Sequence, residues 1–309
     1  MIIVESSGVR IGLSLKNNIE EIISGLKNTF GYRYIPDYSV RISENNERID
    51  TIINWLLGEG FRVKQVSLQD NDIDRYVVES SPPRPYVNES PYFFILQVLS
   101  RSLAKKKYLV ITDSISFYRN GKTYLLMGYP HTGKSTILSI AISKGAIPLS
   151  TENTVVEVRK DGLYIVNGTS ILVYDPIIEE KYSVKIPYIG VTKHGYRIVD
   201  IKSFNSKHNK SYRVDEIYVL HCSFNSIGSD AEIIRGRKIL KTLWHFAYSL
   251  IRGLDYYEPY PLSLSTELVD KYVSEMISEI ARQYKEIYEV FGRHDHVYEY
   301  IVSGKRVNT

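Results

Sequence analysis

Cysteine, methionine and long apolar runs are all scarce in this chain. It carries 1 Cys, Cys222, and 3 Met among 309 residues. No disulfide can form within the chain, and a reducing, cytoplasmic setting is expected. No apolar run approaches the ~20 residues that a membrane-spanning helix needs, and residues 1–5 have neither the length nor the charge of a signal peptide. These absences argue against a disulfide-stapled secreted domain and against a helical membrane protein.

A large excess of one charge is also missing. The net charge is +4, with 24% charged and 43% hydrophobic residues. This composition is that of an ordinary globular protein with a sizeable core. The mild basicity permits a nucleic-acid partner without requiring one, so we expect none. Internal repeats and low-complexity tracts are absent as well, which argues against a repeat architecture.

The stretch 128–136 reads Gly-Tyr-Pro-His-Thr-Gly-Lys-Ser-Thr and matches G-x-x-x-x-G-K-S-T, the phosphate-binding loop of nucleotide-binding proteins. Its glycines adopt backbone angles closed to other residues, so the amides can surround an anion. Lys134 suits the β- and γ-phosphates of ATP, and Ser135 suits Mg²⁺. The predicted nucleotide-binding residues are Gly128, Thr132, Gly133, Lys134, Ser135 and Thr136.

The flanks of the loop match the context that the motif requires. A short apolar strand is predicted over 123–127 and a helix over 137–142, with Gly145 as its stop. Asn120-Gly121 lies between two strand-like runs, and this dipeptide favours a tight hairpin. The strand entering the loop is therefore predicted to be the second arm of a hairpin. In common phosphate-loop GTPases it belongs to a parallel sheet instead.

The remaining chain is predicted to be α/β with two domains. Four prolines within 82–91 place a boundary near residue 85. We expect a small α/β module over 1–85 and a nucleotide-binding domain over 86–309. Helices are predicted around Ile49–Leu56, over 93–103, from Ala231 onward, and over 264–291. The polar tail from Gly292 is expected to fray.

The order of these features resembles the HPr kinase/phosphorylase-like proteins, which share a core with phosphoenolpyruvate carboxykinases. The resemblance rests on the hairpin, the loop 128–136, Gly145, and then Leu149-Ser150-Thr151-Glu152, and covers roughly residues 90–255. It implies an α/β phosphate-loop core with a mixed sheet. It also implies a kinase that uses ATP and Mg²⁺.

Two positions depart from the family pattern. The first acid of an expected acidic pair is Thr151 here, and only Glu152 remains. Asp113 stands just before the hairpin, where the family often has a histidine. Glu152 is accordingly the predicted partner for metal or base, and Asp113 is the substitute. The predicted catalytic residues are Lys134, Glu152 and Asp113, and the predicted metal ligands are Ser135 and Glu152.

The sequence leaves two main functional hypotheses open, and a third, a nucleic-acid-directed kinase, is supported only by the mild basicity. The first is a phosphotransferase that moves the γ-phosphate of ATP to a hydroxyl of a protein or a small molecule. The second is a non-catalytic nucleotide-binding protein for regulation or assembly, which Thr151 favours. Neither the acceptor nor the oligomeric state follows from the sequence, and a homo-oligomer is compatible with it.

Other polar residues are weaker candidates for a functional site. His294-Asp295-His296 lacks a third ligand in sequence, which makes a metal site there a weak prediction. Cys222 has no activating neighbour in sequence and is predicted to be a buried thiol. His131 lies at a freely varying loop position and is expected to be incidental.

Overall fold

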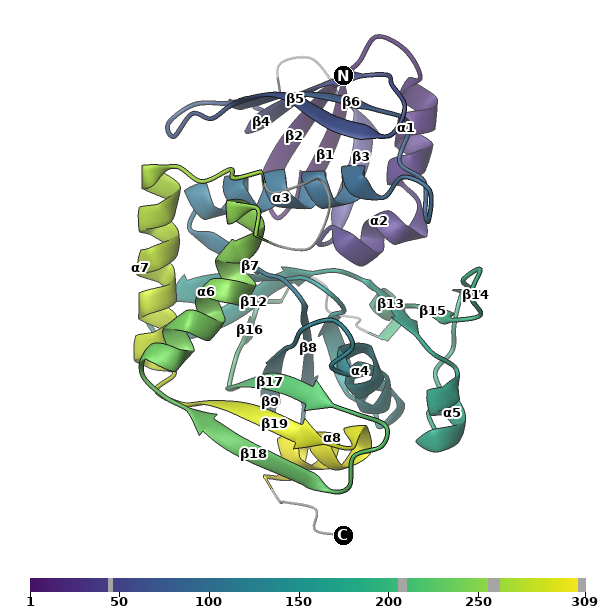
Figure 1. Cartoon of the computed structure of the whole chain (residues 1–309), viewed down its shortest axis with the longest axis vertical. Coiled ribbons are helices and arrows are strands. Elements are labelled where there is room, and N and C mark those ends of the chain that lie inside the picture. Colours follow the sequence, from purple (N-terminus) through teal and green to yellow (C-terminus); the bar gives the residue numbers. More distant parts are fainter. Residues whose placement is uncertain (44–46, 205–209, 255–261, 305–309) are drawn as a thin grey trace. The chain divides into compact units, whose positions relative to one another are not determined.

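The computed structural model describes residues 1–43, 47–204, 210–254 and 262–304. Within these ranges the chain is a mixed α/β protein with eight α-helices and several mixed sheets (Figure 1). It divides into two compact units. Unit 1 comprises Met1–Val110 and Ala247–Met276, and unit 2 comprises Ile111–Phe246 and Ile277–Thr309. Among the described helices, none is both long and apolar enough to cross a membrane.

Unit 1 is built on a six-stranded sheet of order β3-β1-β2-β4-β6-β5. Its strands are β1 (Ile2–Ser6), β2 (Val9–Ser14), β3 (Tyr38–Ile42), β4 (Thr51–Leu56), β5 (Phe61–Ser67) and β6 (Asp74–Ser80). The β2–β4 and β4–β6 pairs are parallel, and the other pairs are antiparallel. The helices are α1 (Ile19–Leu26), α2 (Thr29–Tyr34) and α3 (Ser90–Lys105).

Helix α3 confirms the helix predicted over 93–103, and it is buried along most of its length. In Figure 1 it runs across one face of the unit 1 sheet. Phe94 of α3 meets Tyr76 of β6 edge to face, with ring centroids 5.5 Å apart. The proline run that suggested a boundary near residue 85 instead joins β6 to α3 inside unit 1.

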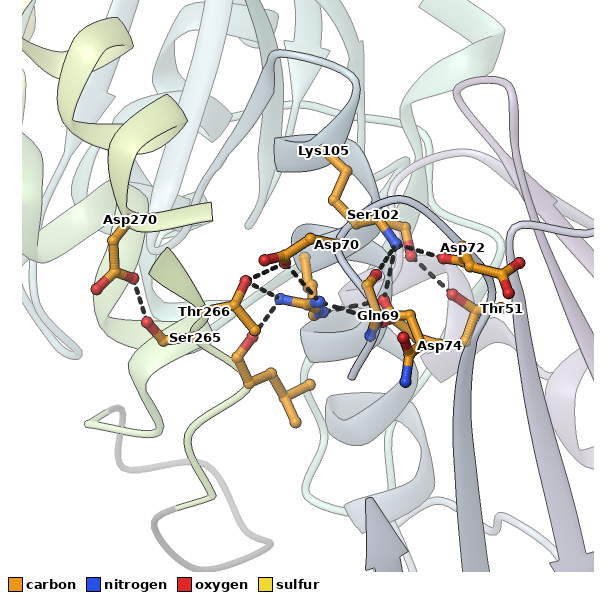
Figure 2. A network of polar contacts seen from close by, with 12 residues as sticks. Thr51, Gln69, Asp70, Asp72, Asp74, Ser102, Lys105, Ser265, Thr266 and Asp270 are labelled. Atoms are coloured by element: carbon orange, nitrogen blue, oxygen red, sulfur yellow. Dashed lines mark hydrogen bonds and ion pairs between the residues drawn. The ribbon is translucent and has the colours of Figure 1, made fainter. Parts of the chain in front are cut away.

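A buried guanidinium holds the discontinuous piece of unit 1 in place. Arg101 is fully buried and donates from Nε to Asp74 Oδ2 at 2.9 Å. Its Nη1 donates to the carbonyl oxygen of Leu264 at 2.9 Å and to Thr266 Oγ1 at 3.1 Å. Figure 2 shows Thr266 and Asp74 on opposite sides of this network, with Asp70 beside Thr266. Residues 264–266 are therefore tied to β6 and α3 by charge-assisted hydrogen bonds.

Unit 2 contains a six-stranded mixed sheet of order β10-β8-β9-β17-β19-β18. Its strands are β8 (Ser114–Arg119), β9 (Lys122–Met127), β10 (Ile147–Ser150), β17 (Glu216–Cys222), β18 (Ser229–Ile234) and β19 (Ile287–Gly292). Strands β9, β17 and β19 are mutually parallel neighbours. Strands β8, β10 and β18 each run antiparallel to their partner.

The remaining elements complete the chain. They are β7 (Tyr108–Ile111), α4 (Lys134–Ser143), β11 (Thr154–Arg159), β12 (Gly162–Gly168), β13 (Ile171–Tyr174), α5 (Ile177–Lys181), β14 (Gly190–Val191), β15 (Arg197–Asp200), β16 (Tyr212–Arg213), α6 (Arg237–Arg252), α7 (Glu267–Gln283) and α8 (His294–Ser303). Helices α4 and α8 pack together on one face of the unit 2 sheet. Ile137 and Leu138 share a core there with Val297, Tyr298 and Ile301.

One predicted helix is a strand. Ile49, Ile52, Ile53 and Leu56 are spaced like one helix face, but Thr51–Leu56 forms β4. Thr51, Ile53 and Trp55 are buried in alternation, which is the period of a strand. The same residues satisfy both patterns. The hydrogen bonds offered by β2 and β6, together with the β-branched and aromatic side chains, decide for the strand.

The C-terminal predictions also need correction. The helix predicted over 264–291 ends at Gln283, and Ile287–Gly292 is the parallel strand β19. The helix expected from Ala231 begins at Arg237, after strand β18. The tail expected to fray contains α8, whose buried residues His294, Val297, Tyr298 and Ile301 are spaced for one helix face.

Candidate functional site

The segment 128–136 follows β9 at the carboxyl end of that strand. Strand β9 pairs antiparallel with β8 through a turn at Asn120-Gly121, so the predicted hairpin is confirmed. On its other side β9 pairs in parallel with β17. The carboxyl ends of parallel strands are where ligands bind in open α/β sheets. The candidate segment therefore lies at the edge where such a site is expected.

The two glycines of this segment are required by close contacts. A Cβ on Gly128 would lie 2.3 Å from Thr132 Oγ1, the hydroxyl that donates to the Tyr129 carbonyl at 2.7 Å. Gly133 has φ of 91°, and its Cβ would lie 2.6 Å from the ring of His294 and 2.8 Å from Cys222 Cβ. Gly133 then caps α4, whose first residue is Lys134. Side chains are thus excluded where the backbone turns into the helix.

Lys134 is buried and fully hydrogen-bonded within the segment. Its Nζ donates to the carbonyl oxygen of Gly128 at 2.6 Å, to that of Tyr129 at 3.0 Å, and to Asp113 Oδ1 at 3.0 Å. An ammonium has three protons, so these three acceptors account for all of them. Both charged groups of the pair are almost completely buried, with 7% and 5% of their side chains exposed.

Asp113 lies between the segment and Glu152. Its carbonyl oxygen accepts from the Gly128 amide at 3.0 Å, and the next amide, that of Ser114, donates to the carbonyl oxygen of Glu152 at 2.8 Å. Asp113 itself has φ of 49°, an uncommon left-handed conformation for a residue other than glycine. The structure therefore brings both predicted acids to neighbouring positions, Asp113 just before the start of β8 and Glu152 just after the end of β10.

Thr151 faces the protein interior. Its hydroxyl is buried, 2.9 Å from the carbonyl oxygen of Ile171 and 3.0 Å from Thr169 Oγ1. The same Thr169 oxygen accepts from the amides of Glu152 at 2.8 Å and Asn153 at 3.1 Å. A carboxylate at position 151 would be directed at a carbonyl oxygen and at a hydroxyl already used by the backbone. Threonine suits this place, and an acid does not.

The hydroxyl residues after Lys134 occupy the first turn of α4. Ser135 and Thr136 are half-buried, and no hydrogen bond to the Ser135 hydroxyl is found in the described part of the chain. The Glu152 side chain is half-buried as well, and its carboxylate makes no hydrogen bond within the described ranges. Carboxylate and hydroxyl oxygens are the ligands that Mg²⁺ accepts. Both groups keep the lone pairs that such a role requires.

Sequence reasoning missed a histidine on the Asp113 side. The ring of His245 of α6 contacts that of Tyr129 of the segment at a tilt of 49°, with ring centroids 4.9 Å apart. Burial lowers the pKa of His245, and the charge of Asp113 opposes that shift. The Tyr129 ring keeps 46% of its surface exposed. Nothing in the local sequence links position 245 to position 113, since more than 130 residues separate them.

Sequence reasoning also missed an aromatic cluster on the other side. His294 lies against Gly133, and its Nδ1 is 3.0 Å from the Tyr182 hydroxyl. Phe224 contacts the His294 ring at 4.7 Å and lies nearly parallel to Tyr182 at 6.1 Å. Burial lowers the pKa of His294 to about 4, so the ring is neutral at pH 7. The helical spacing of 294, 297, 298 and 301 was the pattern that could have shown this residue to be ordered.

Two lower-ranked predictions can be placed as well. Cys222 is buried beside Gly133, and burial raises the pKa of its thiol to about 12, which fits an inert buried cysteine. His131 is exposed with φ of 65°. No group of three or more metal-ligating side chains of the His, Cys, Asp or Glu type is found among the described residues.

No protein-family model matches the chain, and no curated protein matches it.

Proposed function

We propose that the segment 128–136 binds the phosphates of ATP with Mg²⁺ and that the chain transfers the γ-phosphoryl group to a hydroxyl of a protein or a small molecule. The observation that carries the proposal is the buried Lys134–Asp113 pair, set inside a complete G-x-x-x-x-G-K-S-T segment at the carboxyl end of parallel strands. A buried ammonium at the N-terminus of a helix, here α4, is chemistry that suits an anionic polyphosphate.

The arrangement of elements supports the HPr kinase/phosphorylase-like branch. The segment is entered from an antiparallel hairpin and followed by α4, Gly145 and the short strand β10. Glu152 comes two residues after that strand ends. This is the order on which the resemblance rests. From these elements we propose that the chain belongs to that branch. They do not identify the acceptor of the phosphoryl group.

Lys134 has to exchange acceptors when a phosphate arrives. All three of its protons are already donated, so a phosphate oxygen can bind only by displacing Gly128 O, Tyr129 O or Asp113 Oδ1. The polyphosphate is anionic and repels the Asp113 carboxylate, whereas the two carbonyl oxygens are neutral, so Asp113 is the acceptor that it displaces. Displacing Asp113 frees its carboxylate beside the reacting group.

The chain's own groups then have separate tasks. Lys134 and the amides of the segment hold the phosphates in place, and placement supplies much of the rate in phosphoryl transfer. Ser135 and Glu152 would hold Mg²⁺, which when bound neutralises charge on the phosphoryl oxygens. The released Asp113 carboxylate, or Glu152 next to it, accepts the proton of the attacking hydroxyl.

A second candidate function is nucleotide binding without transfer. The inward orientation of Thr151 favours it, because that position supplies no carboxylate to the site. Binding would then act on assembly or regulation. In both candidate functions Lys134 binds the phosphates. The two functions differ only in whether Asp113 and Glu152 take part in phosphoryl transfer.

Calorimetric titration with ADP and ATP, with and without Mg²⁺, tests binding. We expect affinity in the wild type and its loss in Lys134→Ala. Lys144→Ala is the matched control, since Lys144 follows the same helix but is exposed and paired with Glu299. Equal affinity of wild type and Lys134→Ala would refute the proposal. Incubation of cell extract with γ-labelled ATP then separates transfer from binding alone.

A further inference from the structure

The two sides of the 128–136 segment differ in chemistry. On the β8 side lie the carboxylates of Asp113 and Glu152. On the β17 side the strands β17 and β19 end at Cys222 and Gly292, and the residues that follow supply Phe224 and His294. A nucleotide has an anionic, metal-binding end and an aromatic end. The acids suit the first end, and the aromatic side suits the second.

The aromatic side is in direct contact with the segment. The His294 ring occupies the space beside Gly133, and the Cys222 amide donates to the carbonyl oxygen of Thr132 at 3.1 Å. Phe224 lies against His294 with ring centroids 4.7 Å apart. Phe224 is thus separated from the segment by a single buried ring. This spacing suits a nucleotide whose phosphates bind the segment while its base extends past the His294 ring to Phe224.

Phe224 is the exposed member of this cluster. The residue is 37% exposed, whereas His294 is 2% exposed and Tyr182 is half-buried. Tyr182 lies nearly parallel to Phe224, at an angle of 12°. His294 makes its hydrogen bond through Nδ1, and none to Nε2 is found in the described part of the chain. The two partly or fully buried rings hold Phe224 in one orientation while leaving part of it open.

A positive charge accompanies the exposed ring. The ammonium of Lys181 lies 4.8 Å from the Phe224 ring centroid. Lys181 ends helix α5 and is exposed to solvent. Cations over aromatic rings and near phosphates both favour an anionic aromatic ligand. Phe224 and Lys181 together thus match a nucleotide better than they match an uncharged apolar ligand.

We infer that Phe224 is the stacking surface for the base of the nucleotide whose phosphates the 128–136 segment binds. The inference rests on the proposed function and adds a binding residue to it. Stacking of a base on an aromatic side chain tolerates any base, because every base has a π face. The cluster of Phe224, Tyr182 and His294 therefore contributes affinity for the nucleoside part, while Lys134 contributes affinity for the phosphates.

The test compares a ligand that has a base with one that has none. Calorimetric titration with ADP and with inorganic tripolyphosphate, both with Mg²⁺, is carried out on wild type, Phe224→Ala and Phe224→Trp. In Phe224→Ala we expect the Kd for ADP to rise about 10-fold or more and the Kd for tripolyphosphate to stay within about 2-fold of wild type. Phe224→Trp retains a stacking surface and should bind ADP like the wild type.

Phe291→Ala is the matched control. Phe291 has the same exposure, 37%, and stacks on His221. Its neighbour Val290 faces the core shared with α4, so Phe291 points to the opposite face of the sheet. This variant should bind both ligands normally.

The outcomes separate the two claims. If Phe224→Ala binds ADP as tightly as the wild type, the stacking surface is refuted while phosphate binding stands. If that variant loses ADP and tripolyphosphate equally, Phe224 acts on the loop and not on a base, which also refutes the inference. If the wild type binds neither ligand, the proposed function fails and the inference with it.

Discussion

The ammonium of Lys134 lies 3.0 Å from Asp113 Oδ1, and both side chains are buried. The two residues are 21 positions apart and are brought together because the hairpin β8–β9 returns the chain to the edge from which it started. This pair places a negative charge where a phosphate is expected. It underlies the first prediction.

Lys134→Ala should destabilise the fold as well as abolish nucleotide binding. Removal of the ammonium leaves Asp113 buried without a partner, which costs about 3–5 kcal/mol in typical buried pairs. The double variant Lys134→Ala/Asp113→Asn removes the orphaned charge and should recover most of the loss. Urea unfolding of the three proteins measures this. A double variant as unstable as the single would show that the charge of Asp113 is not the cause.

Glu152→Gln should keep the fold and most of the nucleotide affinity but lower turnover by ~10²-fold or more, the scale for losing an acid–base group. The amide preserves the size of the side chain and removes its charge. Initial rates of phosphoryl transfer at saturating ATP measure the effect. If Glu152→Gln leaves turnover unchanged while Asp113→Asn abolishes it, the catalytic carboxylate is that of Asp113.

Gly133→Ala should be far more disruptive than Gly121→Ala. Both glycines have positive φ, of 91° and 83°, so alanine carries a similar backbone cost of about 1 kcal/mol at each. The Cβ at 133 would also collide with His294 and Cys222, whereas at 121 nothing lies within 4 Å. Thermal unfolding and ADP titration of the two variants measure the difference. Equal losses at both positions would mean that the contact with His294 is unimportant.

Stability should fall on acidification because of His294. Its pKa is about 4 in the folded chain against an ordinary 6.5. The unfolded chain therefore takes up the proton first as the pH falls. The contribution of the neutral His294 ring to the free energy of unfolding is fully present above pH 6.5. Between pH 6.5 and 4 the free energy of unfolding falls by on the order of 3 kcal/mol. Asp295 works against the shift and Lys181 reinforces it.

The variant His294→Phe removes this titration while keeping a ring against Phe224. Its free energy of unfolding should depend less on pH between 4 and 6.5 than that of the wild type. His194→Gln, at an exposed histidine, should keep the wild-type dependence. Parallel pH curves for wild type and His294→Phe would count against a buried neutral imidazole at position 294.

Arg101→Met should cost on the order of 3 kcal/mol. It removes the guanidinium from the buried Asp74, which keeps Lys105 at 3.4 Å and the Gln69 amide at 2.7 Å, and it frees the carbonyl of Leu264. Arg75→Met, at an exposed position of β6, should change stability by less than about 0.5 kcal/mol. Urea unfolding of both variants tests the contrast. Similar stabilities would show that the network around Arg101 is not required to hold residues 264–266.

Local chemistry in the sequence was enough to predict the features around the candidate loop. Asn120-Gly121 favours one turn type, and the structure has that hairpin. Gly145, with φ of 81°, follows α4 as predicted. The helix predicted over 93–103 lies within α3. Each of these signals is contained within a few neighbouring residues, so no distant partner is needed to interpret it.

Other segments carried patterns that only tertiary contacts could decide. Ile49–Leu56 suits one helix face and also alternates as a strand, and the neighbouring strands β2 and β6 select the second pattern. Ile287–Gly292 continues the periodicity of α7, but pairing with β17 and β18 makes it a strand. Hydrogen-bond partners more than 20 residues away are invisible to a local pattern.

The features of the candidate site also divide into those that the sequence predicts and those that tertiary contacts decide. The motif alone was enough to predict which residues would enclose an anion, because backbone freedom at Gly128 and Gly133 and the charge of Lys134 are intrinsic to those residue types. Only the tertiary structure decided that Asp113 pairs with that lysine, that Thr151 turns inward, and that His294 packs beside Gly133. The Lys134–Asp113 pair follows from the antiparallel hairpin β8–β9. The contact of His294 with Gly133 joins positions 161 residues apart, because the parallel strands β9, β17 and β19 bring their carboxyl ends to one edge of the sheet.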